Sequence, residues 1–277
     1  GETFPARSEH GGGLPAIRRF NPAAEQAHAY LLGFDLVALV GARRPVAFFG
    51  VEGYPSYLGD PARMVELCQE GRGGAATLAA LADDLKLARR GLEPVERVTD
   101  QDLGENLTPE SAARVVAAWL PDQAIISAEG KTLAFPFNAI AARTSRHASI
   151  VLTGGAFGAA IAAPDRKVVG LQSDGSALYT VQALWSMARE NVDATILIAS
   201  NRRYNILIDE MRRNGYELAS PPVRDLLQLS RPELDWLGMA AGFGVQAERA
   251  TTVSELRRSF RRAMAERGPR LIEVMLP

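Results

Sequence analysis

The chain has 277 residues, enough for one large domain or two ordinary ones, and 47% of them are hydrophobic, which is ample for buried cores. Its 31 basic and 32 acidic residues leave a net charge of −1, and no segment concentrates basic residues, so nucleic acid is not expected as a partner. No stretch is apolar over the length that a bilayer span requires, and no signal peptide opens the sequence, so we expect a cytoplasmic protein with no membrane partner.

The first part of the chain, residues 1–98, shows the alternating pattern of an α/β protein. Predicted helices cover about Pro22 to Leu32 and Ala76 to Leu87, and predicted strands cover Leu36 to Val40 and Pro45 to Phe49. This alternation is typical of a Rossmann-like unit, but it contains too few elements for a complete one. We therefore expect residues 1–98 to form only part of a domain.

The single cysteine and the three histidines give no sign of a metal or catalytic site. Cys68 excludes an internal disulfide, and its place in the helical pattern MVELCQE favours a small core residue over a nucleophile. His10, His28 and His147 are isolated from each other and from ligand spacings, so surface or core roles are expected for them. The run Gly11–Gly13 follows no predicted strand and is interpreted as a flexible loop rather than a phosphate cradle.

The boundary between two domains is predicted in residues 89–106, which are polar, charged and poor in large apolar side chains, as in an interdomain linker. The second domain, residues 107–277, opens with a helix for which Thr108 is the expected N-cap. A buried strand follows over Ala124 to Ser127. The loop Ala128–Thr132 closes it at the C-terminal end, where α/β proteins bind ligands.

The rest of the second domain continues the alternation. Further strands are predicted at five places: Ser149–Leu152, Val168–Leu171, Thr195–Ala199, Gly244–Ala247 and Leu271–Leu276. Helices are predicted between the second and third of these strands, over Trp236–Gly242, and after Thr252, the expected N-cap, whereas Ile206 to Pro222 is predicted as a polar connection. Such alternation favours a parallel sheet with helices on both faces.

Two polar segments follow neighbouring strands of this predicted sheet. Ser173-Asp174-Gly175-Ser176 ends one strand and Ser200-Asn201 ends the next, with 27 residues from Asp174 to Asn201. Strands joined by a right-handed crossover are parallel, so Asp174 and Asn201 should approach each other at one edge of the sheet. Their oxygens, with a backbone carbonyl after Asn201, are hard ligands that suit magnesium. Gly175 permits close backbone approach, and Ser176 marks a helix start that suits an anion.

These features together describe a site for a magnesium-bound diphosphate. Taken alone, each half of the pattern is equally well explained by ordinary turn and capping chemistry. The pair at this spacing, however, resembles the signature of the thiamin diphosphate-dependent enzymes, which is Gly-Asp-Gly followed after about two dozen residues by Asn-Asn. The neighbouring sequences DGSALYTVQALW and NRRYNIL are most similar to the acetolactate synthase large subunit and benzoylformate decarboxylase branch of that family.

The resemblance implies a magnesium ion held by the side chains of Asp174 and Asn201 and by the backbone carbonyl of Arg203. It also implies that the diphosphate lies along four further residues: Gly175, Ser176, Tyr204 and Asn205. Ser173 and Ser200 replace the first residue of each family pair. Neither of these positions ligates the metal, so the departure affects only the tightness of the turn at Ser173.

The resemblance extends to the loops after the other strands. Thr132 is expected to face the diphosphate, and Gly154 and Gly155 are expected to line the cofactor. Glu129 is expected to be structural, because the family's catalytic glutamate lies on a separate pyrimidine-binding domain, and no residue of this chain is expected to be catalytic. The family carries a longer cofactor-lining loop after the glycine pair, whereas here VLTGGA runs almost directly into AAIAAPDRKVV. Because the resemblance is close on both sides of this join, a clean deletion is not expected, and we expect further loop residues between Gly155 and Gly158 that this sequence lacks. An unbroken chain at this join would instead mean a true deletion and would favour a non-catalytic homologue.

The segment FDLVALVGARRPVAFFG resembles the second half of the family's central Rossmann-like domain. Residues 1–98 are thus expected to be the C-terminal part of that domain, and residues 107–277 the thiamin diphosphate-binding, parallel-sheet domain. The central domain mostly supports the others and in acetolactate synthase can carry FAD, but nothing else in the sequence indicates FAD.

Two hypotheses for function follow. The first is a thiamin diphosphate- and Mg²⁺-dependent lyase or transferase acting on 2-keto acids, to which this chain supplies the diphosphate and metal site. Such a chain would be inactive without the pyrimidine-binding domain and would assemble as a homodimer or homotetramer. The second is a non-catalytic homologue with a structural or assembly role. A generic nucleotide-binding protein is disfavoured, because the sequence contains neither the dinucleotide fingerprint nor the complete P-loop motif.

Overall fold

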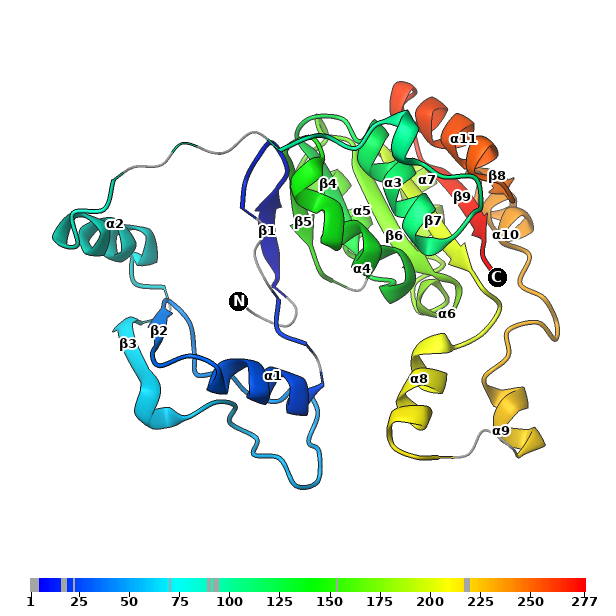
Figure 1. Cartoon of the computed structure of the whole chain (residues 1–277). Helices are drawn as coiled ribbons and strands as arrows, with labels where there is room; N and C mark the ends of the chain where they lie inside the picture. The colour runs from blue at the N-terminus through cyan, green and yellow to red at the C-terminus, as the bar shows by residue number, and fades with distance from the viewer. Residues whose placement is uncertain are drawn as a thin grey trace. The chain divides into compact units, whose positions relative to one another are not determined.

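The computed structural model describes residues 5–15, 19–21, 23–69, 71–88, 91, 95–152, 154–216 and 220–277. These described residues form two compact units (Figure 1). The first holds Pro5 and the described residues between 19 and 91, and the second holds residues 6–15 and 95–277. The division falls between the described residues 91 and 95, inside the segment 89–106, but residues 6–15 group with the second unit.

Among the residues described, the second unit is built on a seven-stranded sheet in the order β1-β5-β4-β6-β7-β9-β8. In chain order its strands are β1 (Arg7–His10), β4 (Ala124–Ala128), β5 (His147–Ile150), β6 (Val168–Ser173), β7 (Ala194–Ser200), β8 (Gln246–Ala250) and β9 (Arg270–Met275). β1 is antiparallel to β5 at one edge, and the other strands pair in parallel. β6 and β7 are buried along nearly their whole length, as their continuous apolar runs require of parallel strands covered on both faces.

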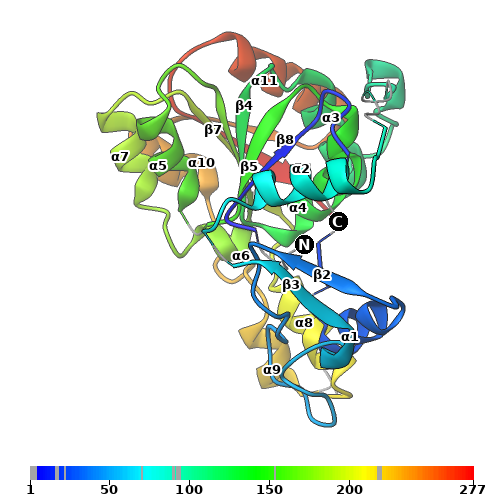
Figure 2. The same ribbon diagram turned by 90° about the vertical axis from the view of Figure 1, so that its left-hand side faces the viewer.

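Helices cover both faces of this sheet, and Figure 2 shows the two layers with the strands between them. One layer comprises α3 (Pro109–Trp119), α4 (Lys131–Ile140) and α11 (Val253–Ala265), which share one buried apolar cluster with the sheet. The other comprises α5 (Gly155–Ala162), α7 (Ala183–Arg189) and α10 (Trp236–Gly242), which share a second cluster. The predicted α/β fold class is confirmed. None of the helices in the described part of the chain is both long and apolar enough to cross a membrane.

The two predicted N-caps of this unit are confirmed. The Thr108 hydroxyl accepts the Ser111 N–H at 3.2 Å at the start of α3, where Pro109 is the first helical residue. The Thr252 hydroxyl likewise accepts the Glu255 N–H at 3.2 Å at the start of α11.

Three predictions for the second unit were wrong in detail. The segment Ile206 to Pro222 is not only a connection, because α8 (Asn205–Arg213) occupies most of it and α9 (Pro221–Leu226) begins at its end. The segment 89–106 is not a free linker throughout, because Val98 and Leu103, around the 3-10 turn η2 (Asp100–Asp102), are buried in the α3 layer. β5 and β8 are displaced by about two residues from the predicted strands; Gly244, with φ +79°, belongs to the turn before β8.

The first unit contains, in its described part, a parallel pair of strands, β2 (Val37–Val40) and β3 (Met64–Cys68). Its helices are α1 (Ala24–Leu32), the 3-10 turn η1 (Pro61–Arg63) and α2 (Gly74–Asp84). The buried cluster is small, consisting of Ala24, Ala27, Leu31 and Leu58. Large side chains of the strand region stay exposed, Leu36 by 63% and Val65 by 41%. So small a core gives this unit little stability of its own. That residues 1–98 are only part of a domain stays a prediction.

Two predictions for the first unit were wrong. The helical pattern around Cys68 is strand β3, where the thiol is buried and donates to the carbonyl of Arg72 at 2.7 Å. The strand predicted over Pro45–Phe49 is reduced to an isolated bridge between Val46 and Tyr57. Short apolar runs of five residues do not by themselves distinguish helix from strand, which explains the first error.

The sequence predicted that the three histidines are isolated from one another, and for two of them this was wrong. His10 on β1 and His147 on β5 are directly opposite in the antiparallel pair, and their rings stack with centroids 5.6 Å apart. Both side chains are buried, so we assign them a packing role where β1 pairs with β5. His28 accepts the N–H of Gly59 and also has a structural role.

Candidate functional site

The C-terminal ends of β6 and β7 lie side by side. Ser173 at the end of β6 is in register with Ala199 near the end of β7. Asp174 and Asn201 follow these ends and are buried, with 1% and 7% of their surface exposed. Asp174 Oδ2 accepts the backbone N–H of Arg202 at 2.5 Å, which ties the two loops together. The structure therefore brings Asp174 and Asn201 to the same edge, as parallel strands require.

The carboxylate of Asp174 is held by backbone donors rather than by a cation. Its Oδ1 accepts the N–H of Gly175 at 2.8 Å, and among the described residues it forms no ion pair. Burial raises the pKa of Asp174 above its ordinary value, and the hydrogen bonds from Arg202 and Gly175 oppose that rise. A buried carboxylate without a positive partner is unfavourable, so a bound cation would stabilise this site.

The other two predicted ligands have oxygens at the same loop. Asn201 Oδ1 accepts the N–H of Arg203 at 3.2 Å, and the carbonyl of Arg203 accepts the N–H of Asn205 at 3.0 Å. No group of three His, Cys, Asp or Glu side chains in the described ranges could hold a metal, so a metal here would depend on one carboxylate with amide and carbonyl oxygens. That donor set is one that magnesium accepts when water and a phosphate complete its octahedron. The residues present fit the implied metal.

Gly175 and Ser176 form the first turn of α6 (Asp174–Ala177). A Cβ atom on Gly175 would lie 2.4 Å from the ring of Tyr204, so only glycine fits under that ring. Ser176 Oγ accepts the N–H of Ser173 at 3.1 Å and donates to Gln172 Oε1 at 2.9 Å. The sequence predicted Gly175 for close approach to a cofactor, and the structure shows a second reason for glycine, the packing of Tyr204.

Thr132 lies in the first turn of α4, directly after β4. Its hydroxyl accepts a hydrogen bond from Ser173 Oγ at 3.2 Å. Gly130, the N-cap of α4, packs so closely on the end of β6 that a Cβ atom would lie 2.2 Å from the N atom of Ser173. Gly130 was not singled out from the sequence, because a lone glycine before a helix has several ordinary explanations.

Gly154 and Gly155 lie at the start of α5, after β5. Gly154 has φ +68°, which favours glycine, and its N–H donates to Glu129 Oε2 at 2.9 Å. The N–H of Gly155 donates to the carbonyl of Leu152 at 3.1 Å. Both amide hydrogens are thus already paired within the protein. Residues 155–158 lie within α5, which begins at the second glycine of the pair.

Tyr204 and Asn205 lie where the chain leaves β7 for α8. The N–H of Tyr204 donates to the carbonyl of Leu227 at 2.9 Å, and Asn205 is the first residue of α8. An ion pair of 3.5 Å between Lys131 and Asp209 joins α8 to the start of α4. All ten predicted site residues therefore follow the C-terminal ends of four parallel strands, β4, β5, β6 and β7, and these ends lie on the same side of the sheet.

Besides Gly130, sequence reasoning missed Gln172 at the ends of these strands. It is the second-last residue of β6, only 6% exposed, and its Nε2 donates to Glu129 Oε2. The sequence offered no signal for it, because glutamine within a predicted strand has no distinctive motif. Glu129 was assigned a structural role, and the structure shows which backbone and side chain it holds.

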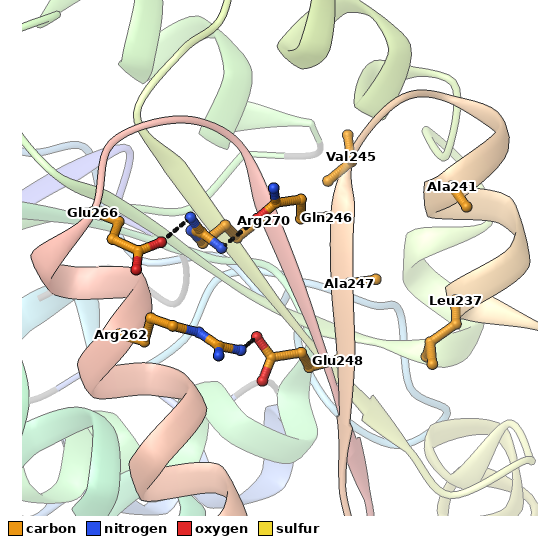
Figure 3. A pocket seen from close by; sticks show the side chains of 9 residues that line it. All are labelled: Leu237, Ala241, Val245, Gln246, Ala247, Glu248, Arg262, Glu266 and Arg270. Carbon is orange, nitrogen blue, oxygen red and sulfur yellow. Dashed lines mark hydrogen bonds and ion pairs between the residues drawn. The ribbon is translucent and has the colours of Figure 1, made fainter.

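A separate pocket of about 650 Å³ lies between α10, β8, β9 and α11, as Figure 3 shows. Arg270 and Gln246, at the N-terminal ends of their strands, line it, so the pocket lies away from the edge that carries Asp174. Within it Arg262 pairs with Glu248, and Arg270 pairs with Glu266. Because these charges are already neutralised inside the protein, the pocket does not compete with the sheet edge as the candidate site.

The chain is similar to known proteins over nearly all of its length. Residues 151–274 match the family described as thiamine pyrophosphate enzyme, C-terminal TPP binding domain. A protein of Mycobacterium tuberculosis (strain ATCC 25618 / H37Rv), provisionally named acetolactate synthase large subunit IlvX, is 43% identical over 286 residues, which cover 100% of this chain and 55% of that protein. Benzoylformate decarboxylase of Pseudomonas aeruginosa is 32% identical over 277 residues, which cover 91% of this chain and 51% of that protein.

A solved structure agrees with this placement. The thiamine diphosphate-dependent 4-hydroxybenzoylformate decarboxylase of Rhodococcus jostii RHA1 superposes with a TM-score of 0.69 at 29% identity, over 94% of this chain and 52% of that chain. This chain spans about half the length of the curated relatives it matches. The matched domain contains the ends of β6 and β7, where Asp174 and Asn201 meet. The chain belongs to the thiamin diphosphate-dependent enzymes, among relatives named acetolactate synthase and benzoylformate decarboxylase.

Proposed function

We propose that this chain supplies the diphosphate and magnesium site of a thiamin diphosphate-dependent lyase or transferase acting on 2-keto acids. The observation that supports it most is Asp174, a buried carboxylate beside Asn201 that lacks a cationic partner among the described residues. The names of the relatives, acetolactate synthase and benzoylformate decarboxylase, favour 2-keto acids as the substrate class. FAD forms no part of the proposal, since no observation on this chain supports it.

In this proposal the residues after the C-terminal ends of the strands bind and orient the cofactor and do not transfer protons. Oxygens of Asp174, Asn201 and Arg203 would hold Mg²⁺. The diphosphate would lie along seven residues: Thr132, Gly154, Gly155, Gly175, Ser176, Tyr204 and Asn205. The bound cofactor supplies the electron sink that lets a bond to the keto carbon break. The buried β6 and β7 keep this anchor rigid, which is what precise orientation of a cofactor needs.

The first test is calorimetric titration of the chain with thiamin diphosphate and MgCl₂. We expect magnesium-dependent binding that Asp174→Ala abolishes, because the site loses its only carboxylate ligand. Asp165→Ala, an exposed carboxylate in the turn before β6, is the matched control and should bind as the unmodified chain does. Binding that survives Asp174→Ala in a folded protein would refute the metal assignment.

The second test concerns turnover. We propose that these 277 residues alone do not decarboxylate 2-keto acids, since the family resemblance puts the activating glutamate on a domain outside them. A preparation shown by mass to hold only this chain should leave pyruvate and benzoylformate unconverted at saturating cofactor. Turnover by such a preparation would mean that a residue of this chain replaces the missing base.

We also propose that the protein assembles as a homodimer or homotetramer, and sedimentation equilibrium would measure the mass of the assembly.

A non-catalytic homologue with a structural or assembly role is the second candidate. The paired amides of Gly154 and Gly155 and Ser173 in place of glycine favour it. Both candidates share the fold and differ in cofactor affinity. Absence of binding heat at millimolar thiamin diphosphate with magnesium would favour this one.

A further inference from the structure

Side chains and backbone N–H groups form a continuous hydrogen-bonded network beneath the candidate site. The N–H of Gly154 and the Nε2 of Gln172 both donate to Oε2 of Glu129, the former at 2.9 Å. Gln172 Oε1 in turn accepts from Ser176 Oγ at 2.9 Å. Ser176 Oγ accepts the N–H of Ser173, whose own hydroxyl donates to Thr132 at 3.2 Å.

This network joins the loops that follow three strands. Glu129 and Thr132 come from the loop after β4, Gly154 from the loop after β5, and Gln172 and Ser176 from the end of β6. Three residues predicted to line the cofactor, Thr132, Gly154 and Ser176, are therefore linked to one another through Glu129, Gln172 and Ser173. Charge-assisted bonds such as those to Glu129 are about twice as strong as neutral ones, so they dominate the network.

Gly154 depends most on Glu129. Its left-handed conformation, φ +68°, starts α5, and the Glu129 carboxylate receives its N–H. Glu129 forms no ion pair within the described ranges, so its position depends on the N–H donors of Gly154 and Gln172. Gln172 is 6% exposed and Glu129 is half-buried, so the bond between them is partly shielded from water.

We propose that Glu129 and Gln172 are positioning residues that fix the Gly154 turn against the end of β6 and so set the geometry of the cofactor-lining loops. The proposal rests on the function proposed above. It predicts that the hydrogen-bond pattern, and not the identity of either residue, is what matters. The exchange Glu129→Gln/Gln172→Glu keeps the same pairs of residues bonded, although the two bonds that converge on Oε2 of Glu129 are then divided between the carbonyl oxygen, which accepts from Gly154, and the amide nitrogen, which donates to position 172. The carboxylate introduced at 172 accepts from that amide and from Ser176.

The test compares Gln172→Glu with the exchange variant Glu129→Gln/Gln172→Glu. In the single variant two carboxylates face each other and the donor to Glu129 is lost, so we expect affinity for thiamin diphosphate with magnesium to fall about tenfold or more. The exchange variant should recover to within about threefold of the unmodified chain. Glu248→Gln, which breaks an ion pair in the separate pocket, is the control and should not change affinity.

Hydrogen exchange at the Gly154 amide provides a second readout that needs no cofactor. We expect faster exchange in Gln172→Glu and restored protection in the exchange variant, while Glu248→Gln leaves it unchanged. An exchange variant that resembles Gln172→Glu in both readouts, or a Gln172→Glu that behaves as the unmodified chain, would overturn the proposal. If the unmodified chain binds no cofactor, the proposed function fails, and protection at Gly154 alone then decides whether the network positions this turn.

Discussion

His147 is fully buried at the start of β5, between His10 on β1 and Phe137 on α4. Its Nδ1 lies 3.0 Å from the carbonyl oxygen of Ser145, and its Nε2 has no partner among the described residues. Burial lowers the pKa of His147, and the Ser145 carbonyl and the Glu9 charge oppose that change. The imidazole is therefore neutral in the folded protein at a pH where an exposed histidine would be protonated.

This lowered pKa makes stability depend on pH in a defined direction. As pH falls through about 6.5 the unfolded chain protonates this histidine more readily than the folded chain, so the unfolded state binds more protons and the free energy of unfolding falls as pH falls. In His147→Gln that part of the slope should disappear. Urea titrations at several pH values between about 5 and 7.5 would measure it. His28→Gln, in the first unit, is the control, and an unchanged slope in His147→Gln would contradict the argument.

The elements differ in how well the sequence predicts them. β6 and β7 were found because long apolar runs end abruptly at polar residues, and strands buried on both faces require such runs. β1 was not predicted, since Arg7–His10 is polar and becomes a strand only by pairing with β5. This pairing between distant segments is not encoded in the local sequence. α8 was missed because its sequence is largely polar, and it buries none of its residues, so tertiary packing does not explain it.

The site, too, has features that the sequence predicts and features that it does not. The proximity of Asp174 and Asn201 followed from parallel strands alone, and the structure places them together. The pairing of Gly154 with Glu129 did not follow, because many polar groups at a strand end could accept that N–H and only the packed loops select one. Backbone topology is thus readable from sequence, whereas the choice among equivalent side-chain partners is not.

α11 provides a test at the scale of one element. Thr252 and Glu255 cap it reciprocally, each accepting the other's backbone N–H at 3.2 Å. We expect Thr252→Ala to lower the free energy of unfolding by about 1 kcal/mol, because an N–H of the first turn loses its acceptor. Ser254→Ala, exposed in the same turn, should change it by less than about 0.5 kcal/mol. Denaturant unfolding of both variants measures the difference, and equal effects would mean that the cap is replaced by water.

For the whole molecule, the two units differ in how complete their cores are. The second has two large buried clusters, one on each face of its sheet, with Leu197 and Ile196 of β7 pointing to opposite sides. The first has one small cluster, which includes Leu31 and Leu58, and leaves strand side chains exposed. We infer that the second unit folds without help from the first.

The grouping of residues 6–15 with the second unit makes this inference testable. A protein that joins residues 5–15 to 95–277 through a flexible linker of roughly 20 residues keeps β1, whereas residues 95–277 alone lack it. The joined protein should unfold cooperatively, with a midpoint near that of the second unit in the full chain. Residues 95–277 alone should melt at a lower temperature, since β5 becomes an open edge and His147 loses the ring of His10. Equal midpoints would show that β1 contributes nothing to stability. Failure of the joined protein to fold would show that the second unit depends on residues 16–94. The first unit would then have to be interpreted as a stabilising part of the second unit, and not as a fragment of a separate domain.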